Sequence, residues 1–229
     1  MTYELTADQK NADSLIKDWY YNSTRQVFVL AGYAGTGKST LLKYSITETL
    51  GLIPDQSVAF VTPTGKAATV LIRQGISATT LHRLIYQSIT QETEIEVNGK
   101  KIKIEKLSFK RRENIDKSIK LIVLDEASMV SDDVMYDLLQ FGVKMIICGD
   151  NAQLPPVEGL NTYLKEPDFT LRQIVRQQLD NPIIKLSQMA REGIYIPYGR
   201  YGDSVSVLNK RFFTGEKRRH CLTTADQII

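Results

Sequence analysis

The stretch Gly32–Thr40 (GYAGTGKST) has the composition of a loop that binds nucleotide phosphates. Its residues match the pattern G-x4-G-K-[ST] in full. Glycine permits the positive φ angles and the close approach with which backbone N–H groups surround phosphate oxygens. At this spacing Lys38 can reach the β and γ phosphates, and the Ser39 hydroxyl can bind Mg²⁺. The stretch therefore indicates binding of a nucleoside triphosphate, rather than a glycine-rich turn with a chance lysine.

Two adjacent carboxylates, Asp125 and Glu126, follow the apolar run Leu121–Leu124. Asp125 can hold Mg²⁺, directly or through water, and Glu126 can orient and deprotonate an attacking water. Such a pair alone is weak evidence. Downstream of a phosphate-binding loop and directly after a buried strand, it indicates hydrolysis of the bound triphosphate.

Gln9 has two interpretations. Thr6 can cap a helix that runs towards Trp19, and Gln9 then falls at the third helical position, which completes a capping box. Alternatively, the amide of Gln9 offers both a donor and an acceptor to the edge of an adenine ring. The spacing alone favours the structural cap.

Three residues of the next segments are candidates for contacts with nucleic acid. Thr64 and Lys66 follow a predicted strand and can hold a phosphate, although Thr64 can instead cap the helix predicted after it. His82 falls in a stretch that we predict to be helical from Ala78 onward. It can stack on a base or serve a purely structural role.

The elements that must position these residues alternate between apolar strands and helices. Apolar runs at Val27–Ala31, Val58–Thr62, Leu121–Leu124 and Met145–Cys148 predict strands of a mostly parallel sheet in an α/β fold. Ligands of such sheets bind at the carboxyl ends of the strands, where the loop, the carboxylate pair and the segment after Cys148 converge. Gln153 lies in that segment. It can sense the γ-phosphate of a bound nucleotide, or it can be a plain loop residue.

Arginines follow near the same edge, in Thr170–Gln177 (TLRQIVRQ). Arg172 or Arg176 can neutralise charge that develops in a transition state. Beyond them, Asn181-Pro182 predicts the start of a helix to about Arg191, and 194–202 is predicted to be irregular.

Residues 87–118 interrupt the alternation. The sequence alternates before and after Asn98-Gly99, a strong turn signal, and predicts a β-hairpin with a lysine-rich second arm. Phe109 follows, flanked by Lys110-Arg111-Arg112. It can stack on a base beside a phosphate backbone or anchor the insertion to the core.

The composition is that of an ordinary globular protein, 42% hydrophobic and 24% charged. The net charge of +3 is uneven, with nine Lys/Arg against three Asp/Glu over residues 100–120, which suggests a polyanionic partner or a solvated surface. No apolar run approaches the roughly 20 residues of a membrane span, and no signal peptide is apparent. Two cysteines are too few for a disulfide framework or a zinc site. We therefore expect a cytoplasmic protein, with Cys148 as a buried free thiol.

Taken together, the motifs resemble the N-terminal half of a superfamily 1 DNA helicase, in particular the RecD/Dda-like group, and we expect a phage member acting in a bacterial host cell. The matching segments run from residue 5 to residue 177 in the order of the family: LTADQKNA, GYAGTGKST, VTPTGKAA, ATTLHRLI, IVLDEASMV, IICGDNAQLPPV and TLRQIVRQ. The resemblance implies a RecA-like P-loop NTPase fold of three layers with a small inserted β-hairpin, ATP and Mg²⁺ as ligands, and 5′-to-3′ movement along single-stranded DNA.

The resemblance also implies roles for individual residues. Gln9 reads adenine, Ser39 and Asp125 hold Mg²⁺, and Glu126 activates water. Gln153 couples the γ-phosphate to DNA, and Arg176 contacts the γ-phosphate. The phosphates are held by Gly35, Thr36, Gly37, Lys38, Ser39 and Thr40. Single-stranded DNA is contacted by Thr64, Lys66, His82 and Phe109, and the inserted hairpin separates strands.

We expect residues 1–86 and 119–199 to form the RecA-like ATPase domain, 87–118 the inserted hairpin, and 200–229 a linker and the start of a second RecA-like domain. Members of the family have that second domain, which carries a further arginine. We therefore expect a truncated or split product with weak or no ATPase activity, and replication or recombination proteins as possible partners. The alternatives are a non-catalytic fragment that binds single-stranded nucleic acid and a P-loop kinase of small molecules, which GDNAQLPPV disfavours.

Overall fold

The computed structural model describes residues 4–33, 35–54, 56–97, 100–150, 159–173, 175, 181–203 and 205–208, with the backbone alone for 91–97, 100–106 and 191. The chain divides into two units, Met1–Ile174 and Val175–Ile229. The first unit contains the sheet and the motifs that predict nucleotide chemistry.

A six-stranded parallel sheet forms the centre of the first unit, in the order β3-β2-β6-β7-β1-β8. The strands are β1 (Val27–Gly32), β2 (Val58–Thr62), β3 (Ala78–Thr80), β6 (Leu121–Leu124), β7 (Lys144–Gly149) and β8 (Phe169–Leu171). Every pairing is parallel, which confirms the predicted sheet. The two edge strands were missed, because three residues are too short to show a period. Ala78–Thr80 is a strand, and the helix predicted from Ala78 begins only at Leu81.

Helices cover both faces of the sheet, which gives the predicted three layers. On one face α1 (Ala7–Asn22), α2 (Lys38–Tyr44) and α3 (Gly65–Arg73) pack against alternate residues of the strands, and α2 continues into a π-helical turn, Ser45–Thr49. On the other face lie α4 (Leu81–Ile85) and α5 (Asp132–Leu139). Neighbouring strand residues face opposite sides, as Leu30 and Val29 do. The described helices include none that is long and apolar enough to cross a membrane.

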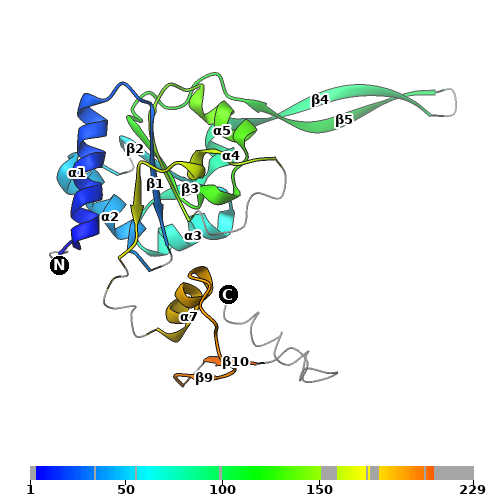
Figure 1. Ribbon diagram of the computed structural model, residues 1–229. Coiled ribbons are helices and arrows are strands. Elements are labelled where there is room, and N and C mark those ends of the chain that lie inside the picture. The colour runs from blue at the N-terminus through cyan, green and yellow to red at the C-terminus, as the bar shows by residue number, and fades with distance from the viewer. Residues whose placement is uncertain are drawn as a thin grey trace. The chain divides into compact units, whose positions relative to one another are not determined.

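The inserted hairpin consists of β4 (Tyr86–Val97) and β5 (Lys100–Arg111), paired in antiparallel register from Tyr86↔Arg111 to Val97↔Lys100. It forms a sheet of its own and extends beyond the helices of its unit (Figure 1). The predicted hairpin is thus confirmed, while its turn at Asn98-Gly99 lies outside the described residues. Phe109 lies within β5, not after the hairpin as the sequence suggested, because the pairing continues beyond the strictly alternating residues.

In the second unit, α7 (Pro182–Arg191) begins after Asn181, whose side chain accepts a hydrogen bond from the Ile183 N–H. This confirms the predicted helix start. The segment predicted to be irregular instead contains β9 (Gly199–Tyr201), which pairs with β10 (Val205–Val207). Gly202, with φ 65°, reverses the chain between them.

Candidate nucleotide-binding site

The glycines of Gly32–Thr40 have the geometry that the motif requires. Gly35 and Gly37 adopt φ angles of 82° and 75°, where only glycine is unstrained. Gly37 is the N-cap residue of α2, and no side chain caps that end of the helix. A Cβ atom at Gly32 would lie 3.0 Å from both Leu171 Cβ and Thr36 Oγ1. A side chain at Gly32 would therefore push these neighbours apart, and a side chain at Gly35 or Gly37 would strain the backbone.

The side chains of Lys38 and Thr36 stabilise the curved conformation of the loop by hydrogen bonds to its own carbonyl oxygens. The Lys38 Nζ donates to the carbonyl oxygens of Gly32 (2.7 Å) and Tyr33 (3.1 Å), which keeps the ammonium inside the curve of the loop. The buried Thr36 donates its hydroxyl to the Tyr33 carbonyl at 2.8 Å. The fold thus keeps a cation at the loop, where it can attract the negative charge of phosphates.

The backbone differs between the two carboxylate residues at the end of β6. The Asp125 N–H donates to the Val61 carbonyl of the neighbouring strand at 2.9 Å, so this hydrogen bond holds Asp125 at the end of β6. Glu126 then adopts the left-handed conformation, with φ 54° and ψ 38°, and among the described residues no other non-glycine residue has a positive φ. Its N–H donates to Asp125 Oδ1 at 2.9 Å. Backbone strain of this kind is concentrated at functional sites.

The charges of the site influence one another. Burial raises the pKa of Asp125, against the hydrogen bond from the Glu126 N–H and the Lys38 ammonium. Desolvation and then the Asp125 charge raise the pKa of Glu126, again against Lys38. The structure therefore brings Lys38, Asp125 and Glu126 together. Gln153, the fourth residue expected here, lies outside the described residues, as does Arg176.

Cys148, in β7, interacts with Asp125 of the carboxylate pair. It is fully buried and free, as predicted. Burial raises the pKa of its thiol well above the ordinary value, and a hydrogen bond links the thiol to Asp125. The thiol therefore stays neutral and serves as a donor to the carboxylate.

Gln9 contacts the phosphate-binding loop and caps α1 at the same time. Its Oε1 accepts from the Thr6 N–H at 3.0 Å, and the Thr6 hydroxyl accepts from the Gln9 N–H at 3.3 Å, which confirms the predicted capping box. Its Nε2 donates to the carbonyl oxygens of Thr36 (3.1 Å) and Gly37 (3.5 Å). Adenine reading by Gln9 stays a prediction.

Two of the residues expected to contact DNA line one open hollow at the base of the hairpin, of about 390 Å³. The side chain of Phe109 is 70% exposed, and the His82 ring lies 5.4 Å from that of Tyr86, centroid to centroid. Arg83 and Arg112 also line a second hollow next to the first. The first hollow is lined by His82, Arg83, Tyr86, Gln87, Ser88, Phe109 and Arg112.

The other two residues expected to contact DNA are placed by α3 and do not line that hollow. The Thr64 hydroxyl accepts from the Ala67 N–H at 3.2 Å, so it caps α3 as one of the two interpretations had it. Lys66 is exposed in the first turn of the helix. A phosphate contact by either residue stays a prediction.

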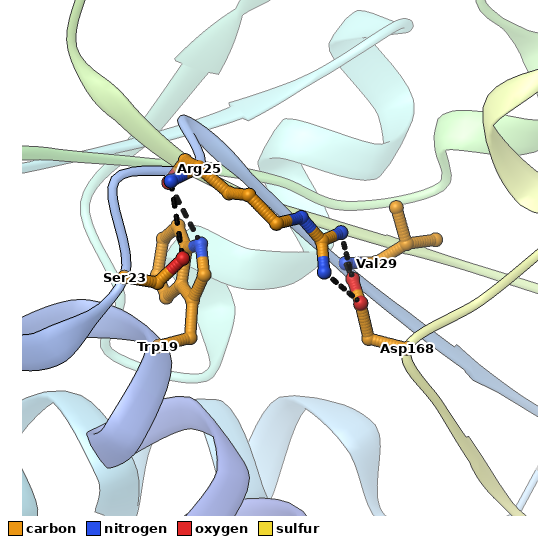
Figure 2. Close-up of polar contacts among 5 residues, drawn as sticks. All are labelled: Trp19, Ser23, Arg25, Val29 and Asp168. Carbon is orange, nitrogen blue, oxygen red and sulfur yellow. Dashed lines mark hydrogen bonds and ion pairs between the residues drawn. The ribbon is translucent and has the colours of Figure 1, made fainter.

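Three polar residues that brace the site were missed. Asn161 Nδ2 donates to the carbonyl oxygens of Ala127 (2.6 Å) and Val130 (2.9 Å), just after the carboxylate pair. Asp8 accepts from backbone N–H groups that follow β8. Asp168 accepts from the Val29 N–H of β1 at 2.8 Å and pairs with Arg25 through two hydrogen bonds (Figure 2). Each is a single polar residue whose partner is distant in sequence, so no local pattern identifies it.

A parallel sheet with a glycine loop after β1 and a carboxylate pair after β6 defines a P-loop nucleoside triphosphatase of RecA-like fold. Comparison with known proteins then gives the family. The chain belongs to the family described as AAA domain, which matches residues 4–202.

Individual relatives agree with this assignment. The chain is 29% identical over 175 residues to the uncharacterized protein R530 of Acanthamoeba polyphaga mimivirus, covering 66% of this chain and 33% of that protein. It is 30% identical over 195 residues to the ATP-dependent DNA helicase PIF1 of Candida albicans, covering 71% of this chain and 20% of the helicase. The crystal structure of Bacteroides Pif1 bound to ssDNA superposes with a TM-score of 0.54 at 21% identity, over 85% of this chain and 48% of that one.

These matches confirm the resemblance to superfamily 1 helicases of the Pif1 and RecD kind, and the first unit has the fold of their N-terminal RecA-like lobe. The chain spans a third or less of the length of the two curated relatives and about half of the solved structure. A phage origin stays a prediction.

Proposed function

We propose that this chain is the ATP-binding and ATP-hydrolysing motor lobe of a 5′-to-3′ DNA helicase, which couples hydrolysis to movement on single-stranded DNA. The observation that carries the proposal is the grouping of Lys38, Asp125 and Glu126 at the carboxyl edge of a parallel sheet, with Glu126 in a strained conformation. It is supported by the relatives named as ATP-dependent DNA helicases and by a related structure solved with ADP-AlF3 and ssDNA.

The residues present fit Mg·ATP. The loop has no room for a side chain at Gly32, has positive φ angles at Gly35 and Gly37, and keeps the Lys38 ammonium at its backbone, so residues Gly35 to Thr40 would hold the phosphates. Ser39 and Asp125 would hold Mg²⁺, which when bound neutralises charge on the phosphate oxygens. Glu126, whose pKa is raised, is suited to accept the proton of the attacking water. Gln9 would read adenine, while Gln153 and Arg176 would sense the γ-phosphate.

Single-stranded DNA would bind across the base of the hairpin. Phe109 and His82 offer ring faces on which bases stack, and Arg83 and Arg112 lie beside them to meet phosphates. Thr64 and Lys66, at the start of α3, would contact the phosphates of neighbouring nucleotides. The hairpin, residues 87–118, would then separate the strands of a duplex.

The family resemblance implies a second RecA-like lobe that supplies a further arginine to the same nucleotide. An arginine of this kind contributes about 10³–10⁵ in rate in other phosphoryl-transfer enzymes. We therefore propose that hydrolysis by this chain alone is slow and that a second lobe accelerates it.

The test is a single-turnover ATPase assay with and without single-stranded DNA. DNA-stimulated phosphate release supports the motor lobe. DNA binding without any turnover, even when a candidate second lobe is added, supports instead a non-catalytic nucleic-acid-binding module.

Nucleotide binding is tested by Lys38→Ala. Loss of the ammonium removes a charge-assisted contact and should lower ATP affinity about 10- to 100-fold, measured by titration calorimetry. Lys43→Ala, an exposed lysine of the same helix, is the matched control and should bind as the unmodified chain does. Equal ATP affinity of Lys38→Ala and the control would refute the site.

A further inference from the structure

A short turn follows Glu126 directly and is bonded at both of its ends. It is the 3₁₀-helical turn Ala127–Met129, which ends at Val130. Asn161 donates from Nδ2 to the carbonyl oxygens of Ala127 (2.6 Å) and Val130 (2.9 Å). The side chains of Ala127 and Val130 are themselves buried in the core. One amide and the core packing therefore hold this turn in place from two sides.

Asn161 is itself held by its neighbours. Its Oδ1 accepts from the Leu164 N–H at 3.4 Å. The Leu160 carbonyl accepts from the Asp132 N–H at 2.7 Å, and the Thr162 N–H donates to Asp132 Oδ1 at 2.9 Å. Because Asp132 is the first residue of α5, the residues on both sides of Asn161 are attached to the start of that helix. The Asn161 amide is thus a donor fixed in position.

Glu126 lies at the junction between two fixed segments. Before it, the Asp125 N–H bonds the Val61 carbonyl of β2, and after it comes the turn that Asn161 bonds. The Glu126 carbonyl accepts from the Met129 N–H of this turn at 3.3 Å. A left-handed backbone is costly for a residue with a side chain and persists only where its surroundings impose it. On the C-terminal side of Glu126, the bonds from Asn161 supply that constraint.

We propose that Asn161 is a positioning residue for ATP hydrolysis, which fixes the turn after Glu126 and so keeps the carboxylate of Glu126 with Lys38 and Asp125, where it can activate water. This inference rests on the proposed function. The described hydrogen bonds of the Asn161 side chain all go to backbone groups, so it acts through the backbone of Glu126. It should therefore influence the rate of hydrolysis and leave the affinity for nucleotide unchanged.

The first experiment compares Asn161→Ala with Asn161→Asp in the full chain. Aspartate has the shape of asparagine but, when ionised, no donor for the two carbonyl oxygens. Single-turnover ATP hydrolysis with single-stranded DNA should fall about tenfold or more in both variants, because a displaced catalytic group is inefficient. Affinity for a non-hydrolysable ATP analogue, measured by titration calorimetry, should not change. Thr162→Ala is the matched control, since Thr162 is exposed and its described hydrogen bonds are made by its backbone.

A second experiment needs no hydrolysis and tests whether Asn161 imposes the conformation of Glu126. Glycine adopts a positive φ without strain, whereas alanine at this position keeps the strain. The unfolding equilibrium constants of Glu126→Ala and Glu126→Gly are measured by urea denaturation, with Asn161 present and in Asn161→Ala. The ratio of the alanine constant to the glycine constant should be about fivefold larger with Asn161 present, because the turn can relax without it. The freedom of glycine in the unfolded chain is the same in both backgrounds and cancels.

Several outcomes would overturn the inference. One is an undiminished rate of hydrolysis in Asn161→Ala, and another is an equal loss of hydrolysis and of analogue affinity, which indicates general damage to the fold. A third is the same alanine-to-glycine ratio in both backgrounds, which would show that Asn161 does not impose the strained conformation. If the unmodified chain does not hydrolyse ATP even with DNA and an added second lobe, the proposed function itself fails, and this inference falls with it.

Discussion

The nucleotide edge of the sheet and the base of the hairpin are built in opposite ways. At the nucleotide edge the described contacts of Gln9, Lys38 and Asp125 involve backbone groups, and the supporting residues are buried. At the base of the hairpin, side chains make the described contacts with α5. The Tyr86 hydroxyl donates to Asp137 of α5 at 2.6 Å, and Arg111 lies 3.7 Å from the same carboxylate.

The two regions also expose different groups to a ligand. The nucleotide edge presents a loop of fixed shape, which suits a reaction whose atoms must be aligned. The hollow beside the hairpin presents an exposed phenyl ring and two arginine side chains, which suits contacts with the bases and phosphates of a single strand. The difference indicates that chemistry and strand contact can be disrupted separately. Glu126→Gln and Phe109→Ala should each affect only one of them, and Tyr86→Phe should affect neither.

The largest effect is expected for Glu126→Gln. The amide has the shape of the carboxylate but cannot accept the proton of water, so single-turnover hydrolysis should fall about 100-fold or more. Binding of ATP and of single-stranded DNA should be retained. Glu48→Gln, an exposed glutamate in the π-helical turn, serves as the control. Undiminished hydrolysis by Glu126→Gln would show that another group activates the water.

Phe109→Ala tests the other region. Loss of a ring that stacks on a base should weaken binding of a single-stranded oligonucleotide about tenfold, measured by fluorescence anisotropy, with ATP affinity unchanged. Leu107 lies on the same side of β5, is 64% exposed and has no ring, so Leu107→Ala is a matched control. Equal losses in the two variants would indicate a general apolar surface rather than stacking.

Tyr86→Phe should have the smallest effect, confined to stability. It removes the hydrogen bond to Asp137 and should lower the free energy of unfolding by about 1 kcal/mol, measured by urea denaturation at neutral pH. ATP hydrolysis should not change.

The pH dependence provides a check on this variant. Burial, and then the bond to Asp137, raise the pKa of Tyr86 to about 12 from an ordinary 10.0. Because the folded-state pKa is the higher one, this contribution is complete below pH 10 and is lost as the pH rises towards 12. The difference between the unmodified chain and Tyr86→Phe should therefore narrow over that interval. A constant difference would show that the hydroxyl does not titrate as the structure indicates.

The sequence predicts those structural features that depend on residues close together in the chain. The loop around Lys38, the capping box of Thr6 and Gln9, and the hairpin all have local patterns, and the structure contains each of them. It does not predict that the Gln9 amide also bonds the loop carbonyls, because the two lie 27 residues apart.

The polar residues that stabilise the site could not be predicted from the sequence, for the same physical reason. Asn161 and Asp168 each satisfy backbone groups of a segment that only the folded sheet brings near. The left-handed backbone conformation of Glu126 could not be predicted from the sequence either, since glutamate has no preference for it. The contacts that hold the site in place therefore mostly join segments that are far apart in the sequence. The residues that carry its chemistry can nevertheless be recognised from local motifs.

The register of the hairpin allows the length of its arms to vary without changing the residue pairs at its base. The arms pair without a slip from Tyr86↔Arg111 to Val97↔Lys100, so matched residues can be gained or lost near the turn without shifting the partners at the base. Each pair changes the length of the arm by about 3.4 Å. Evolution or design can therefore lengthen or shorten the hairpin by one residue pair at a time, while its contacts with α5 stay the same.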